Sequence, residues 1–388
     1  DSEAIRGLDK ERGVSYLATK TEAQQIKPRL TLPSFEEVRD DKKKYLRTSL
    51  LIEREQNYLS AKTIVQYHGS KAVIVSPPAL PLSISEMDEI YKLPFSKEPH
   101  FIYKKMYGEN VKIKAHEMIE FSITSHRGCF GGCSFCGLSL HQGKVIQSRS
   151  ELSIVTEIEK LKDNPRFKGF VSDIGGPTAN MYGMGAYDIN KCNICKRNSC
   201  IMPLVCENIN ISHDKIIKLL NKAEKINGIK KIFIASGIRY DLALKSNHYL
   251  KELIRKHVGG HLKVAPEHAD DDVLNLMRKP KFELFLKFKK IFEEISKEAG
   301  LKQYIVPYFI SNFPASTPEK MNKISKWLQK EKWNLQQVQS FIPLPMTMAS
   351  TIYYTGINPY TKENIHIPKV CSEKKLQQAL LQPHRKKK

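Results

Sequence analysis

The 388-residue sequence lacks any run of about 18 apolar residues, so we do not expect a membrane-spanning helix. Its first residues, DSEAIRGLDKERG, lack an initiator methionine, a basic start and an apolar stretch, so they do not form a secretory signal peptide. The sequence also lacks internal repeats and low-complexity tracts. We therefore expect a cytoplasmic globular protein, and we interpret the chain as a fragment of a longer one.

Acidic residues are scarce relative to basic ones. The chain has 63 Lys and Arg against 41 Asp and Glu, which gives a formal net charge of +22. One interpretation is a solvated lysine-rich surface, because segments such as KFELFLKFKKIFEEISKEAG (281–300) mix Lys and Glu around apolar positions. The other is attraction to nucleic acid or another polyanion, to which the terminal HRKKK would contribute. The composition leaves both interpretations open.

Cysteine is scarce outside one region. Seven of the eight cysteines lie between residues 129 and 206, and Cys371 stands apart. A disulfide framework would spread its cysteines more evenly. Clustered cysteines in a chain without a secretory signal instead favour metal binding or redox chemistry.

From residue 118 onward, short apolar runs alternate with amphipathic helical segments, which is typical of βα units around a parallel sheet. Strands are expected at 118–125, 167–176, 230–237, 261–268, 303–311 and 337–345. Helices are expected near 151–163, 212–227, 240–257, 270–299 and 317–332. Six units are too few for a closed eight-stranded barrel. The predicted fold class is therefore α/β, a partial (βα)6 TIM-like barrel.

The predicted domain division follows this pattern. Residues 1–110 form a mixed N-terminal region, which contains a charge-rich helical stretch and a strand-like run at 71–82. Residues 111–346 form the partial barrel, with a Cys-rich insertion at about 186–210 after the second strand. Residues 347–388 form a C-terminal extension with a basic tail.

The stretch SHRGCFGGCSFCGLSLHQGK (125–144), here termed the cysteine loop, holds Cys129, Cys133 and Cys136 in C-x3-C-x2-C spacing with no fourth cysteine nearby. A structural zinc site normally needs four ligands, and an electron-transfer [4Fe–4S] cluster needs four cysteines. Three thiolates can hold three irons of a cube and leave the fourth iron open to a substrate or cofactor. The glycines permit the backbone angles that wrapping a cube requires. The loop therefore predicts a [4Fe–4S] cluster with an open iron.

A second group, here termed the cysteine quartet, lies in CNICKRNSCIMPLVC and comprises Cys192, Cys195, Cys200 and Cys206. Four cysteines within fifteen positions form a complete ligand set for either zinc or a second iron–sulfur cluster. Both alternatives remain open from the sequence.

In barrels of this kind the chemistry sits where the strands exit. The cysteine loop follows the first predicted strand, Gly175 and Gly176 end the second, and Ser236 and Glu267 lie at the ends of the third and fourth. We therefore expect one site at one mouth of the barrel, with Ser236 among its cofactor-binding residues.

The cysteine loop, with Phe135 before its last cysteine, resembles the radical S-adenosylmethionine (SAM) superfamily, and Phe135 joins the predicted cofactor-binding residues. Gly175, Gly176 and Thr178 are similar to that superfamily's glycine-rich motif, whose backbone contacts the cofactor's amino group. The Pro177-Thr178 pair departs from the common GGE form of this motif.

The resemblance also implies roles at two later strand exits. Arg239, after the third strand, would meet the cofactor carboxylate. Glu267, in APEHADDDVLNLMRKP (265–280), would lie near the ribose, as in methylthiotransferase-like members.

From about 118 to 371 the chain resembles the YgiQ-type subfamily through RGCFGGCSFC, SDIGGPTANMY, RNSCIMPLVCENINISHD and FIPLPMTMASTIYYTGINP. The resemblance implies that a [4Fe–4S] cluster reductively cleaves SAM to methionine and a 5′-deoxyadenosyl radical, which takes hydrogen from a substrate. The implied partners are a reductant such as flavodoxin or ferredoxin and a substrate that is RNA, a protein or a small molecule. The alternative function is a basic, zinc-stabilised nucleic-acid-binding protein.

Overall fold

The computed structural model describes residue 7 and residues 11–384. Residues 385–388 of the predicted basic tail, and most of the N-terminal stretch on which the fragment interpretation was based, lie outside the described residues.

The N-terminal region contains a four-stranded sheet in the order β1 (Ser15–Thr19), β4 (Lys71–Val75), β3 (Thr63–His68), β2 (Arg29–Thr31). Its helices are α2 (Lys20–Gln25), α3 (Phe35–Asp40) and α4 (Lys42–Arg54). Val65, Ala72 and Ile74 are its buried core. Helices α3 and α4 are separate because the Asp41 side chain accepts from the backbone N–H groups of Lys43 and Lys44 and so starts a new helix. Of this sheet the sequence predicted one strand, in the run at 71–82, and the observed β4 occupies only its first five residues.

Three short helices, α5 (Ile84–Lys92), α6 (Ile102–Tyr107) and α7 (Lys114–Ile119), lead from this sheet to the βα array. Each of the six predicted strand segments contains an observed strand. These are β5 (Ser122–Thr124), β8 (Phe170–Val171) with β9 (Asp173–Gly175), β12 (Lys231–Ile232), β13 (His261–Glu267), β14 (Tyr304–Ser311) and β15 (Gln339–Ser340).

Neighbouring strands of this array are parallel and follow chain order. Strand β5 pairs with β9, β8 with β12, β13 with β14, and β14 with β15. A parallel bridge between Ile238 and Val264 links the third and fourth segments. Because all these strands run the same way, their carboxyl ends meet at one edge, where the cysteine loop and the residues of the glycine motif lie.

Three predicted helices match α9 (Glu151–Lys160), α10 (Asp214–Glu224) and α15 (Pro318–Lys330). Two predicted helices were wrong as single elements. The segment 240–257 is divided into α11 (Tyr240–Ala243), α12 (Asn247–Glu252) and the π-helical turn η5 (Leu253–His257), because the Ser246 side chain caps a new start. The segment 270–299 is divided into α13 (Asp271–Met277) and α14 (Phe282–Glu298), because Arg278 is left-handed (φ +57°) and Pro280 follows.

The main core lies between the strands and these helices. Ile123, Val171 and Ile232 from the strands pack with helix residues such as Leu220 and Phe288, and all five are essentially inaccessible to solvent. Full burial of each such side chain contributes about 1.5–3 kcal/mol, so this layer makes the strand edge a rigid platform for the loops above it.

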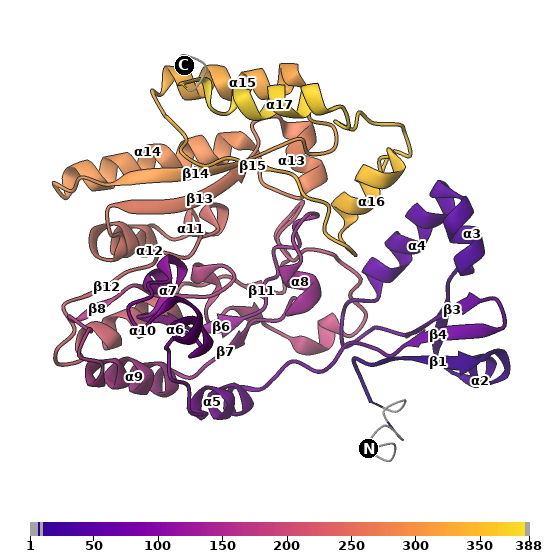
Figure 1. Ribbon diagram of the computed structural model, residues 1–388, viewed down its shortest axis with the longest axis horizontal. Helices are drawn as coiled ribbons and strands as arrows, with labels where there is room; N and C mark the ends of the chain where they lie inside the picture. Colours follow the sequence, from indigo (N-terminus) through magenta and orange to yellow (C-terminus); the bar gives the residue numbers. More distant parts are fainter. Residues whose placement is uncertain (1–6, 8–10, 385–388) are drawn as a thin grey trace.

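The two C-terminal helices pack against earlier helices of the chain. Helix α16 (Met348–Thr355) lies beside α4, and α17 (Cys371–Leu380) lies along α15 (Figure 1). Within the described part of the chain, no helix has both the length and the apolar character required to cross a membrane.

Candidate functional site

The cysteine loop is closed at its base by an antiparallel pair, β6 (His126–Arg127) and β7 (Gln147–Ser148), and contains the short helix α8 (Leu138–His141). Two of its glycines are required by the backbone. Gly128 has φ +85° and Gly132 has φ +62°, and a Cβ at either position would overlap a carbonyl oxygen, of Val145 and Asn198 respectively. Only glycine fits where the loop folds back on itself and on the quartet segment.

The three thiols of the loop lie together and are free of disulfides. A Cβ on Gly131 would lie 3.3 Å from the Cys129 Sγ and 4.0 Å from the Cys133 Sγ, and the Cys136 backbone N–H donates to the Cys133 carbonyl at 3.2 Å. Burial raises the pKa of Cys129, and raises that of Cys136 to about 11. These two thiols are therefore protonated at neutral pH without metal, and metal binding would release their protons. The donor set fits three corners of an iron–sulfur cube.

Arg239 places a cation at these sulfurs. Its Nη1 donates to the Cys133 Sγ at 3.6 Å, while its Nε and Nη2 form a bidentate pair with Asp241 at 2.8 and 2.6 Å. Burial alone would lower the pKa of Arg239, but the Asp241 carboxylate outweighs burial and raises it. Asn180 holds the Arg239 backbone at both ends, accepting from its N–H at 2.9 Å and donating to its carbonyl at 3.0 Å. Sequence reasoning missed Asn180, because no spacing rule marks it.

The glycine motif packs against the same loop. A Cβ on Gly175 would overlap the side chains of Ser236 and Asp173, and one on Gly176 would overlap the ring of His126. The Thr178 Oγ1 lies 3.7 Å from the Cys129 Sγ. The Ser236 hydroxyl donates to Asp173, whose other carboxylate oxygen accepts from the backbone N–H groups of Ala235 and Ser236 at 2.8 and 3.1 Å. Thr178 therefore lies beside the Cys129 sulfur, whereas the Ser236 hydroxyl is hydrogen-bonded to Asp173.

Glu267 sits at the exit of β13 in a left-handed conformation (φ +69°) and is buried. Burial raises the pKa of its carboxyl, against the opposing charges of Lys279 and Arg239. The Lys279 Nζ lies 3.7 Å from the Glu267 carboxylate, and the charge of Glu267 acts on Cys136. Lys279, also missed from the sequence, is the buried cation that stabilises this carboxylate.

Phe135 anchors the loop by apolar packing. Its ring packs edge-on against Phe313, with centroids 6.2 Å apart, in an apolar cluster beside the loop. The preceding Ser134 donates its N–H to the Met277 carbonyl at 3.0 Å and its hydroxyl to the Leu276 carbonyl at 2.6 Å. The middle of the loop is therefore fixed to the end of α13.

A buried ion pair ties the N-terminal region to this loop. The Glu53 carboxylate accepts from both terminal nitrogens of Arg278 at 2.7 and 2.9 Å. Arg278 also donates to the Gly132 carbonyl at 3.4 Å, and the Asn198 side chain donates to Glu53 at 2.8 Å. One carboxylate thus connects α4, the cysteine loop and the quartet segment.

The quartet segment lies against the cysteine loop. The Cys200 backbone N–H donates to the Phe130 carbonyl at 3.1 Å, and the Ser199 hydroxyl donates to the Gly131 carbonyl at 2.7 Å. The two cysteine groups, separated by more than fifty residues in sequence, are therefore direct neighbours.

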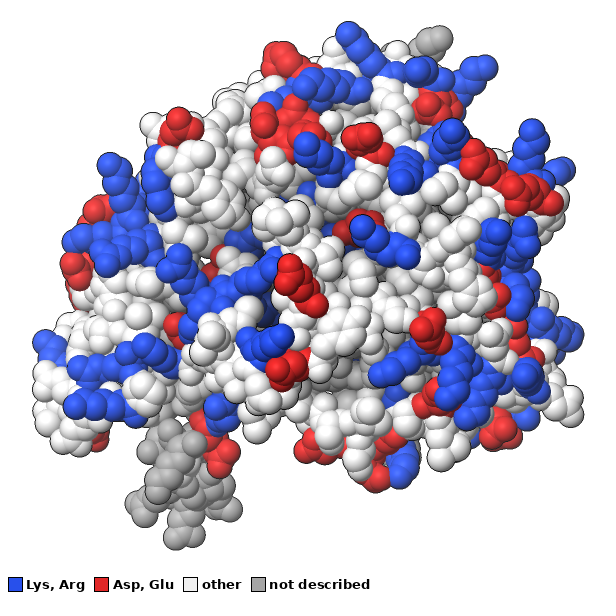
Figure 2. All heavy atoms as spheres, turned by 180° about the vertical axis from the view of Figure 1, so that it is seen from behind, with Lys and Arg blue, Asp and Glu red and all other residues white. Residues whose placement is uncertain are grey.

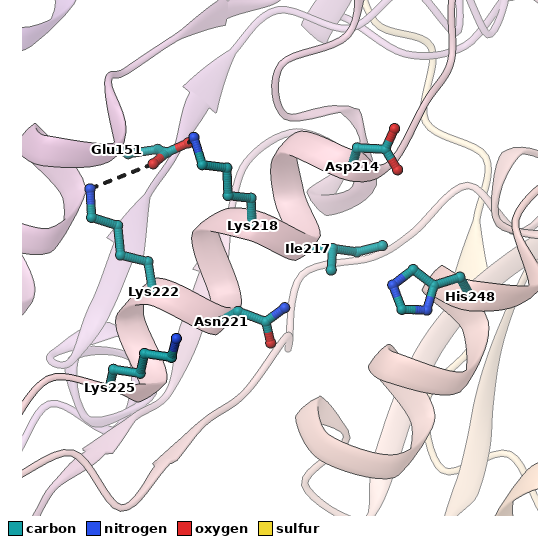
Figure 3. A pocket seen from close by; sticks show the side chains of 8 residues that line it. All are labelled: Glu151, Asp214, Ile217, Lys218, Asn221, Lys222, Lys225 and His248. Atoms are coloured by element: carbon teal, nitrogen blue, oxygen red, sulfur yellow. Dashed lines mark ion pairs between the residues drawn. The ribbon is translucent and has the colours of Figure 1, made fainter.

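A surface hollow elsewhere is lined by residues of α9, α10 and α12, with Glu151 paired to Lys218 and Lys222 at 3.2 and 3.6 Å (Figure 3). Another is lined by His261 and Tyr304, at the amino ends of β13 and β14. Neither hollow contains a predicted site residue.

The basic charge is not concentrated on the face shown in Figure 2, where Lys and Arg side chains are spread with Asp and Glu among them. This mixture is typical of a solvated surface, the first of the two interpretations of the net charge.

Family models match almost the whole chain. Residues 1–122 match the radical SAM N-terminal region, residues 123–328 match the radical SAM superfamily, and residues 336–387 match a domain of unknown function. The matches lend no support to the alternative of a nucleic-acid-binding protein.

Curated relatives include UPF0313 protein RPA0679 of Rhodopseudomonas palustris, 44% identical over 92% of this chain and 53% of the relative. UPF0313 protein YgiQ of Escherichia coli K12 is 45% identical over 91% of this chain and 48% of the relative. The chain spans about half the length of the curated relatives it matches.

Solved structures with a partial likeness include the radical SAM methyltransferase TsrM from Kitasatospora setae, with cobalamin and a [4Fe–4S] cluster bound (TM-score 0.39, 13% identity, 67% of this chain and 46% of that one). Coproporphyrinogen III oxidase (HemN) of Escherichia coli gives a TM-score of 0.37 at 17% identity, over 66% of this chain and 50% of that one.

Proposed function

Because this chain belongs to the radical SAM superfamily, we propose that it is a radical SAM enzyme whose Cys129, Cys133 and Cys136 hold a [4Fe–4S] cluster. The observation that carries the proposal is the grouping of three free thiols, in which the Cys129 and Cys133 sulfurs lie beside Gly131 and both act electrostatically on Cys136, with no fourth cysteine in the loop. The chemistry supplied when the cluster and SAM are bound is reductive cleavage of a sulfonium C–S bond, giving methionine and a 5′-deoxyadenosyl radical that abstracts hydrogen from a substrate.

The protein's own residues bind and orient the cofactor. Gly175 and Gly176 allow the backbone to approach closely, Arg239 keeps a positive charge beside Cys133, and buried Glu267 offers a hydrogen-bond acceptor near Cys136. The proposed cofactor-binding residues are Phe135, Gly175, Gly176, Thr178, Ser236, Arg239 and Glu267.

The finer architecture is proposed on the same basis. The parallel strands in chain order support a partial (βα)6 barrel over residues 111–346, with an N-terminal region at 1–110, a Cys-rich insertion at 186–210 and a C-terminal extension at 347–388. The proposed partners are a one-electron reductant such as flavodoxin or ferredoxin and a substrate that supplies the hydrogen atom. The proposed location is the cytoplasm.

The test is 5′-deoxyadenosine formation. Protein reconstituted with iron and sulfide without oxygen, then given dithionite and SAM, is expected to produce 5′-deoxyadenosine measurable by mass spectrometry. The Cys133→Ala variant is expected to produce none. Cys371→Ala is the matched control, because this exposed thiol lies outside both cysteine groups, and it is expected to leave the product unchanged. Equal product from Cys133→Ala and the control would refute the proposal.

A further inference from the structure

The cysteine quartet converges although its members span fifteen positions. The segment is closed by an antiparallel pair, β10 (Gly185–Ala186) and β11 (Ile209–Asn210), and Cys206 lies near enough to Cys192 for its charge to act on that thiol. The Asn208 amide donates to the Asp188 carbonyl at 2.7 Å and to the Cys192 Sγ at 3.6 Å. Tight turns follow within the loop, where the Cys195 N–H donates to the Cys192 carbonyl at 3.1 Å and the Cys206 N–H to the Cys200 carbonyl at 2.7 Å.

This part of the chain has little apolar material of its own to hold it together. Ile201 packs into the apolar cluster beneath the cysteine loop, but Tyr187, Ile194 and Leu204 are 70%, 86% and 75% exposed, and all four thiols are half-buried and free of disulfides. A segment of this length with one fully buried apolar side chain of its own, and with four half-buried thiols, gains its stability from a bound metal.

The N-terminal region fixes the quartet from outside. The Asn57 amide donates to the carbonyls of both Cys192 and Cys195 at 2.9 Å, and the Ser60 hydroxyl donates to the Cys195 carbonyl at 3.1 Å. Groups that hold the backbone of ligand residues orient their side chains toward the metal.

The spacing of the sulfurs favours an iron–sulfur cluster over a single zinc ion. Tetrahedral zinc with Zn–S bonds of about 2.3 Å places its four sulfurs about 3.8 Å apart. Among the described residues, which include all four of these cysteines, no three of the quartet sulfurs lie within 4.8 Å of one another. The three thiols of the cysteine loop share this wider spacing. Ligands on different irons of a cube must stand further apart than ligands on one ion.

We propose that the cysteine quartet holds a second [4Fe–4S] cluster, ligated by Cys192, Cys195, Cys200 and Cys206. With four thiolates, each iron has a protein ligand and none is open to SAM. Lys144, held by the Arg197 carbonyl, lies near Cys195 and Cys200 and offsets the negative charge of the four-thiolate cluster. This inference goes beyond the proposed function and does not depend on it.

The test uses a variant that lacks only the loop ligands, Cys129→Ala/Cys133→Ala/Cys136→Ala, purified without oxygen beside the wild type. Iron, sulfide and zinc are counted per chain. The wild type is expected to contain about eight irons and eight sulfides, and the triple variant about four of each. After dithionite reduction, the triple variant is expected to give an electron paramagnetic resonance signal that does not change when SAM is added.

A reciprocal variant, with the quartet changed to serine, is expected to lose about four irons from the wild-type count, and Cys371→Ser to lose none. The wild-type Mössbauer spectrum is expected to resolve two cluster environments, a measurement that does not require any variant to fold. About one zinc per chain with about four irons in the wild type would overturn the inference, as would a triple variant that retains zinc or no metal.

Discussion

Replacing Glu53 with Gln is expected to destabilise the protein and loosen the cysteine loop. The Glu53 and Arg278 side chains are only 10% and 9% exposed, and they meet through two hydrogen bonds of 2.7 and 2.9 Å. Removing one partner leaves the other charge buried without compensation, which costs about 3–5 kcal/mol. At roughly 2–4 °C per kcal/mol, the melting temperature is expected to fall by roughly 6–20 °C, measured by circular dichroism.

The same change is expected to lower iron retention at the cysteine loop, because Arg278 also donates to the Gly132 carbonyl and Asn198 donates to Glu53. Glu89→Gln is the matched control. It removes an ion pair with Lys92 in which both side chains are 66% exposed, so no measurable change in melting temperature is expected. The double variant Glu53→Gln/Arg278→Met should recover much of the loss, because it no longer buries an unpaired charge. A melting temperature for Glu53→Gln equal to that of the control would contradict this reasoning.

Gly132→Ala is expected to reduce iron binding and to destabilise the protein by a few kcal/mol, since the new Cβ would overlap the Asn198 carbonyl as well as strain a residue with φ +62°. Gly143→Ala is the control for backbone strain without steric overlap, because Gly143 also has a positive φ (+79°) but has open space around it. Equal iron contents in the two variants would show that overlap with the Asn198 carbonyl has no effect on iron binding. For pH dependence, burial lowers the pKa of His213 to about 4 and that of His268 to about 3. The unfolded chain therefore binds more protons below pH 6.5, and this stability is expected to be present above about pH 6.5 and lost as the pH falls through about 4 for His213 and about 3 for His268. The slope in urea-unfolding free energy should be smaller in His268→Asn, and an unchanged slope would exclude His268 as a cause.

The order and approximate position of the parallel strands were predictable because each buried strand reads as a short apolar run between helical segments. The two divided helices were not. Ser246 looks like an ordinary helix residue until its side chain accepts from the Tyr249 N–H. The break at Arg278 depends on a left-handed residue that pairs with Glu53, 225 positions away in sequence.

The grouping of the loop cysteines was predictable because their spacing is local, whereas their role as cluster ligands stays a prediction. Their surroundings depend on tertiary contacts that no spacing rule contains. Asn180 is identified only once its amide is seen to hold both backbone groups of Arg239, and Lys279 only once it is buried beside Glu267. Buried polar groups need partners, so such residues follow from the packing rather than from a motif.

The N-terminal region is better understood as part of the metal-binding structure than as an appendage. Glu53 neutralises the arginine that holds Gly132, and Asn57 binds the carbonyls of Cys192 and Cys195. Without these two residues, Arg278 would be buried unpaired and both carbonyls would lose their hydrogen bonds, so each cysteine group would lose a support that its own segment does not supply. Because the stretch 53–57, at the end of α4 and just after it, reaches both groups, changes there are expected to affect the two proposed iron sites together, whereas changes to the thiols are expected to affect them one at a time.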